Sequence, residues 1–104
     1  MSIIGMTRKA LLDPYMLDVL MAELVGRDRA PSAYLVYLKL WYLCGGPGRK
    51  GSPLSLQTLA TETGVSKSSV QSAVRLLKSR RLITVRRGSK TAIPVYTVHT
   101  PWRR

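Results

Sequence analysis

The sequence predicts a mainly α-helical domain with one small β-hairpin. Apolar residues recur at helical spacing through most of the chain, and residues typical of helix starts and ends lie between these stretches. Only the segment 82–99 is predicted to form a pair of strands. With 104 residues, 45% of them hydrophobic, the chain can bury a single small core. We expect one compact unit, in which residues 1–30 form a helical extension that packs on a domain spanning 31–104 or on a partner subunit.

Positive charge is concentrated in the second half of the chain. Residues 1–43 contain five Lys/Arg and four acids, whereas residues 44–104 contain twelve Lys/Arg and one acid, Glu62. A basic surface opposed by almost no carboxylate favours a polyanionic partner, because phosphate backbones attract it and release counterions on binding. We therefore look for function in the second half.

The sequence gives little support for a disulfide-bonded, membrane, secreted or catalytic protein. The single cysteine, Cys44, allows no internal disulfide, the apolar run 34–44 is about half of what a bilayer needs, and the start does not resemble a signal peptide. We expect a cytoplasmic, nucleoid-associated protein without membrane contact. His99 is the only histidine, so we predict no catalytic residues, metal site or cofactor, and we see no room for a small-molecule effector domain.

Two helices are predicted in the first half. Asp13 and Pro14 form a helix start, Gly26 offers the stop after Leu24 or Val25, and one face should hold Leu17, Leu20, Met21 and Leu24. The second helix should run from Pro31 to Leu43 and is apolar nearly all round, so it must be covered on several sides. We interpret its stripe of Tyr34, Tyr37 and Trp41 as core or subunit packing. The Gly/Pro-rich segment 45–53 is predicted to be an irregular surface loop.

The next segment has the form of two helices joined by a tight turn. Ser55 is expected to cap a helix over 56–63, Gly64 to end it in a left-handed conformation, and Ser66 to cap a helix over 67–80. Small Ala60 would let the two helices cross closely, and Val65 would fill the corner between them.

The helix 67–80 has two distinct faces. Val70, Ala73, Val74 and Leu77 share the buried one. The opposite face contains no acid, and its short polar side chains would let the helix enter a DNA major groove, with Arg75 and Gln71 as possible base readers. The predicted DNA-binding residues of this helix are Lys67, Ser68, Ser69, Gln71, Ser72, Arg75, Lys78 and Ser79.

A basic hairpin follows this helix. Residues 82–86 are expected to form a strand, 87–90 a turn and 91–99 a returning strand, which Pro94 should restrict to the edge of a sheet. The tip would present Arg86, Arg87, Ser89 and Lys90 to a phosphate backbone or minor groove. The sequence leaves open whether the tail 102–104 is frayed or forms a further phosphate anchor.

The segment 31–98 resembles the winged helix-turn-helix family of bacterial DNA-binding proteins. The resemblance lies in Leu59-Ala60, Gly64-Val65-Ser66, Val70, Ala73-Val74, Leu77 and Leu82-Ile83, and in the closing Tyr96-x-Val98. It implies that the helix 67–80 is the recognition helix and that residues 86–90 form the wing. Two positions depart from the pattern: Arg81 replaces a usual glycine, and Leu76 replaces a usual polar residue, where it would pack on the N-terminal helix or meet a partner subunit.

These observations predict a protein that binds double-stranded DNA in a sequence-specific manner and regulates transcription. One alternative is replication initiation or plasmid maintenance, which the same fold serves. Another is a protein-interaction module whose basic face binds an acidic partner. The excess apolar surface of the first two helices further predicts a homodimer formed through them.

Overall fold

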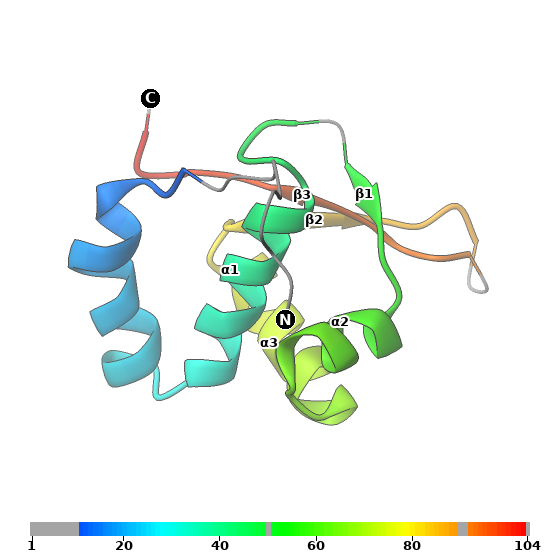
Figure 1. The fold of residues 1–104 in the computed structure, drawn as a ribbon, viewed down its shortest axis with the longest axis horizontal. Helices are drawn as coiled ribbons and strands as arrows, with labels where there is room; N and C mark the ends of the chain where they lie inside the picture. Colours follow the sequence, from blue (N-terminus) through cyan, green and yellow to red (C-terminus); the bar gives the residue numbers. More distant parts are fainter. Residues whose placement is uncertain (1–10, 50, 90–91, 104) are drawn as a thin grey trace, which may run out of the picture.

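The computed structural model describes residues 11–49, 51–89 and 92–103. An N-terminal helix, made of η1 (Met16–Leu20) and η2 (Ala22–Arg27), precedes α1 (Pro31–Leu43), β1 (Ser52–Pro53), α2 (Leu56–Thr63), α3 (Lys67–Ser79), β2 (Ile83–Arg86) and β3 (Val95–Val98). The strands form a small sheet from which the β2–β3 hairpin extends past α2, while the N-terminal helix packs beside α1 (Figure 1). The expected mainly α-helical fold with a small β-hairpin is confirmed. No helix in these ranges has the length and apolar character needed to cross a bilayer.

The N-terminal helix begins where the sequence predicted but buries a different face. The Asp13 carboxylate accepts a hydrogen bond from the Tyr15 amide at 2.9 Å, as expected of a cap. Further along, hydrogen bonds join residues five apart, such as the Met21 amide and the Met16 carbonyl, so each turn is wider than in an α-helix. Residues four apart therefore line up on the inner side, and Met16, Leu20 and Leu24 are buried. Our assignment of Leu17 and Met21 to the buried face was wrong, since both are exposed.

The end of this helix also differs from the prediction. Gly26 does not stop it, because the wide turns continue to Arg27 and the Asp28 amide still bonds to the Glu23 carbonyl at 2.8 Å. The chain reverses only at Arg29, which takes a left-handed φ of 51°.

Helix α1 forms the centre of the molecule, and its aromatic stripe is core, as interpreted from the sequence. Tyr34, Tyr37 and Trp41 are buried, and each directs its polar atom to a backbone carbonyl. Tyr34 donates to Met16 at 2.6 Å, Tyr37 to His99 at 2.7 Å and Trp41 to Leu11 at 3.0 Å. Burial raises the pKa of both tyrosines, which keeps them neutral donors. One helix thus ties the N-terminal helix to the end of the sheet.

The α2–α3 pair follows the predicted local signals closely. The Ser55 and Ser66 hydroxyls accept hydrogen bonds from the Thr58 and Ser69 amides at 3.0 and 3.2 Å. Gly64 ends α2 with a φ of 77°. Arg81 ends α3 with a φ of 60°, and the amide of the next residue, Leu82, bonds to the Leu77 carbonyl at 2.9 Å, which completes a Schellman motif.

The sheet corrects two predictions. Its order is β1-β3-β2, with Ser52 opposite Tyr96 and Ile83 opposite Val98 in antiparallel register. The end of the predicted loop 45–53 is therefore a short strand, and the returning strand of the hairpin is central rather than at an edge. Pro94 is compatible with this position because it lies just before β3, and only its carbonyl pairs, accepting a hydrogen bond from the Leu54 amide at 3.0 Å.

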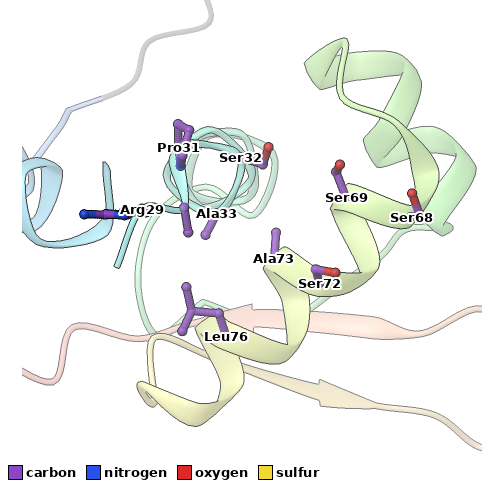
Figure 2. Close-up of a pocket in the computed structure, with 10 residues that line it drawn as sticks. Arg29, Pro31, Ser32, Ala33, Ser68, Ser69, Ser72, Ala73 and Leu76 are labelled. Atoms are coloured by element: carbon purple, nitrogen blue, oxygen red, sulfur yellow. The ribbon is translucent and has the colours of Figure 1, made fainter. Parts of the chain in front are cut away.

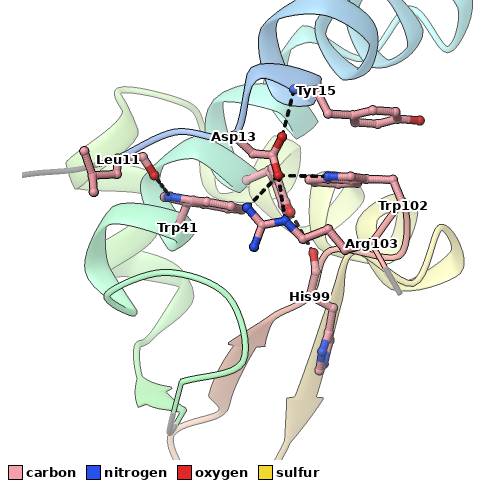
Figure 3. A network of polar contacts seen from close by, with 8 residues as sticks. Leu11, Asp13, Tyr15, Trp41, His99, Trp102 and Arg103 are labelled. Atoms are coloured by element: carbon pink, nitrogen blue, oxygen red, sulfur yellow. Dashed lines mark hydrogen bonds and ion pairs between the residues drawn. The ribbon is translucent and has the colours of Figure 1, made fainter.

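The C-terminal tail is neither frayed nor a free anchor over its described residues. The Asp13 carboxylate accepts hydrogen bonds from Trp102 Nε1 at 3.1 Å and Arg103 Nε at 2.7 Å (Figure 3). Trp102 also stacks on Tyr15, with 4.5 Å between the ring centroids. The tail therefore fastens the start of the N-terminal helix, while Arg104 lies outside the described residues.

Candidate nucleic-acid interface

Helix α3 separates its buried and exposed faces as the sequence spacing predicted. Val70, Ala73 and Leu77 are buried against the core, and Val74 is half-buried. Of the eight predicted DNA-binding residues on this helix, only Ser69 is partly buried. The exposed ones are Lys67, Ser68, Gln71, Ser72, Arg75, Lys78 and Ser79. The structure thus gathers these side chains along one continuous, solvent-facing strip.

Four of the predicted serines of α3 also have local structural partners, and the Ser68 hydroxyl lies 3.4 Å from that of Ser66. The Ser69 hydroxyl accepts a hydrogen bond from the Ser66 hydroxyl at 2.9 Å, which places it in the cap of α3. Ser79 donates to the Leu76 carbonyl at 2.7 Å, and Ser72 accepts a hydrogen bond from Arg75 at 3.4 Å. The contact between Ser72 and Arg75 is long and joins two exposed side chains.

The hairpin presents a second set of predicted residues. Arg86 closes β2, paired in register with Val95, and Arg87 and Ser89 follow in the turn. All three are exposed, whereas Lys90 lies outside the described residues. The hairpin extends past α2 at one end of the molecule (Figure 1), so its basic turn projects from the body.

Four of the five acidic side chains are paired with cations outside the α3 strip. Asp28 forms an ion pair with Arg80, Glu62 with Lys39 at 3.2 Å, and Asp13 with Arg103 at 2.6 Å. Glu23 lies 4.0 Å from Arg27 on its own helix. Sequence reasoning did not foresee that Arg80, at the end of α3, is engaged by Asp28, because their positions are 52 residues apart. The cations of the strip therefore face no carboxylate of the strip itself.

Leu76 lies on the flank of α3 and not in the exposed strip. It is half-buried against the core and lines a groove together with the segment 29–33 that leads into α1 (Figure 2). The sequence left open whether Leu76 packs on the N-terminal helix or meets a partner subunit. The structure packs it partly buried against the core, across the groove from the segment 29–33.

One comparison with known proteins found a match. Residues 43–93, just under half of the chain, match the family model of bacterial regulatory proteins, gntR family. The matched segment runs from the end of α1 through α2 and α3 into the hairpin. Comparisons with curated proteins and with solved structures gave no match. The match points to a DNA-binding regulator rather than to an enzyme.

Proposed function

Because the chain is a winged helix-turn-helix DNA-binding protein of the regulatory type, we propose that α3 is its recognition helix and that residues 86–90 form its wing. The observation that carries the proposal is the exposed, acid-free strip on α3. An α-helix of this kind fits the major groove, where arginine and glutamine side chains can form paired hydrogen bonds with base edges.

We assign different roles to the two basic elements. We assign base reading to Arg75, which lies in the middle of α3, and phosphate contact to Arg87, which lies in the wing turn. Base contacts distinguish sequences, and phosphate contacts strengthen binding to all of them. The two roles therefore predict different effects on specificity.

Binding titrations with a selected site and an unrelated duplex test this assignment. Arg75→Ala should cost about 1–3 kcal/mol of discrimination between the two duplexes. Arg87→Ala should weaken both equally and reduce the slope of log K against log salt by about 0.9, the value for one phosphate contact. Arg27→Ala, which removes an exposed arginine from the N-terminal helix, is the matched charge control. Identical behaviour of Arg75→Ala and Arg87→Ala would contradict the division of roles, and no duplex binding at low salt would favour a protein-interaction module.

We further propose a homodimer formed through the N-terminal helix. Leu17, Met21 and Val25 are 50%, 39% and 40% exposed and are spaced four residues apart, each directly after a buried residue, so they form an apolar stripe on the flank of the helix. Two such stripes can cover each other across a two-fold axis, because an isologous interface pairs one surface with itself. The two recognition helices would then meet half-sites about 34 Å apart, or a multiple of that distance.

Analytical ultracentrifugation tests the dimer. Leu17→Glu should give a monomer at concentrations at which the wild type is dimeric. Leu35→Glu, which places the same charge at a 47% exposed leucine of α1, should leave the dimer intact. A wild-type protein that stays monomeric at high concentration would refute this interface.

A further inference from the structure

A groove of about 420 Å³ runs between α3 and the start of α1 (Figure 2). One wall is the segment 29–33, which comprises the end of the link after the N-terminal helix and the first turn of α1, and includes Arg29 and Ser32. The other wall is a flank of α3 that borders the proposed base-reading strip and shares Ser68 and Ser72 with it. Its residues are Ser68, Ser69, Ser72, Ala73 and Leu76. The lining thus combines hydroxyl groups, small apolar side chains and one cation, and it contains no carboxylate.

The acid closest to this groove in the sequence is already neutralised. Asp28 precedes Arg29, and its carboxylate forms an ion pair with Arg80, which follows α3. An unpaired carboxylate at this position would repel an anion in the groove, since like charges at short range are unfavourable. The ion pair also joins the end of the N-terminal helix to the end of α3, and so it holds the two walls together.

Arg29 occupies a backbone position that suits glycine better. Its φ of 51° lies in the left-handed region, which costs a non-glycine residue stability. The residue is exposed at the outer rim of the groove, and its side chain extends away from α3 in the view of Figure 2. Its guanidinium is therefore exposed to solvent beside the groove.

The width of the major groove determines what would lie beside α3. A helix is about 10–12 Å across with its side chains, and the major groove is about 12 Å wide, so a docked helix is flanked closely by both phosphate strands. The segment 29–33 stands on one flank of α3. A strand of DNA on that side must pass along the groove.

We propose that this groove receives one sugar–phosphate strand of the duplex, with Arg29 and the hydroxyls of Ser32 and Ser68 as its phosphate contacts. The proposal rests on the proposed docking of α3 and extends the interface beyond the recognition helix and the wing to the start of α1. Contact requires only that the exposed Arg29 side chain turn toward the strand.

The test uses Arg29→Gly in the full chain, with Arg27→Ala as the control that removes the same charge two residues earlier. Duplex affinity is measured by fluorescence anisotropy over a range of salt, and thermal unfolding is followed in parallel. Arg29→Gly should weaken all duplexes about tenfold, as expected for one charge-assisted hydrogen bond, and should reduce the salt slope by about 0.9. Its unfolding temperature should be unchanged or higher, because glycine relieves the left-handed strain. Arg27→Ala should leave both affinity and slope near the wild-type values.

The outcomes separate this proposal from the proposed function. If Arg29→Gly and Arg27→Ala have equal effects, Arg29 acts only through long-range electrostatic attraction to the DNA. The groove then makes no direct contact with a phosphate. If Arg75→Ala impairs discrimination while Arg29→Gly binds like the wild type, the recognition helix stands and the groove proposal alone fails. Ethylation interference gives an independent readout, because the variant should lose a phosphate contact that the wild type shows.

Discussion

Arg81 ends α3 in a conformation that glycine adopts more easily. Its φ is 60°, and the Schellman hydrogen bonds around it fix the turn into β2. Left-handed backbone costs a non-glycine residue about 1 kcal/mol or more, while a cation after the last turn of a helix returns about 0.3–1 kcal/mol. The two effects nearly cancel, so arginine is tolerated here without changing the fold.

Two substitutions at this position separate the two effects. Arg81→Gly and Arg81→Ala both remove the charge, but only glycine removes the strain, so the glycine variant should be about 1 kcal/mol more stable than the alanine variant. At Arg75, in the middle of α3, the order should reverse, because glycine in a helix interior is about 1 kcal/mol less stable than alanine. Urea unfolding of the four variants measures both differences. The same order at both positions would contradict the left-handed conformation of Arg81.

Among the elements, α1, α2 and α3 could be predicted from the sequence almost to the residue. Their boundaries depend on local signals: Pro31 at the first turn, the serine caps at Ser55 and Ser66, and Gly64 at the corner. The N-terminal helix was placed correctly at its start only. Its wide turns change which residues face inward, and apolar spacing alone does not distinguish them from α-helical turns.

Strand β1 was missed because nothing local specifies it. It has two residues, one of them proline, and exists only through its pairing with β3. The preceding residue, Gly51, allows this close approach: a Cβ there would collide with Val95 and would lie 3.0 Å from Thr97 Oγ1. For the same reason the position of Pro94 gave the wrong edge assignment, since the sequence cannot show which strand lies beside it.

Gly51→Ala should therefore destabilise the protein by about 1–3 kcal/mol, the usual range for overpacking. Gly88→Ala is the control, because a Cβ at Gly88 meets nothing within 4 Å, and its effect should stay within about 0.5 kcal/mol. Thermal or urea unfolding measures both variants. If Gly51→Ala unfolds like the wild type, β1 does not depend on this close approach.

At the scale of the whole molecule, Asp13 links residues that are far apart in the chain. It caps the N-terminal helix and binds Trp102 and Arg103, contacts across about 90 positions that sequence spacing cannot reveal. The proposed site was more accessible to prediction, since the residues of α3 and the wing lie close together in sequence. The groove beside α3 was not foreseen, because it joins segments that lie far apart in the chain.

The Asp13 network predicts a stability that depends on acid pH. The hydrogen bonds from the Tyr15 amide, Trp102 and Arg103 hold the pKa of Asp13 below its usual value. A carboxyl group whose pKa is lower in the folded than in the unfolded state raises the free energy of unfolding. This contribution is complete at a pH above the pKa in the unfolded state, about 3.9, and is lost as the pH falls through the pKa in the folded state. Asp13→Asn should therefore unfold at a lower temperature than the wild type at pH 7, and the difference should shrink below about pH 4.

Thermal unfolding between pH 2 and 7 measures this convergence. Asp18→Asn, which removes an exposed carboxylate from the same helix, is the charge control. If the difference in unfolding temperature between the wild type and Asp13→Asn is constant across this range, the side chain of Asp13 stabilises the fold by packing and not by its charge.

The order of the sheet has a consequence for how the chain reaches its native state. Strand β1 precedes α2 and α3 in sequence. Within the described residues it nevertheless pairs only with β3, which is the last of the named elements along the chain. Its pairing must wait until the intervening helices and β2 have brought β3 into place, since distant contacts carry the larger loop-closure entropy. We therefore expect the Leu54 amide, whose hydrogen bond to the Pro94 carbonyl continues the pairing of β1 with β3, to be among the last to acquire protection from hydrogen exchange during refolding.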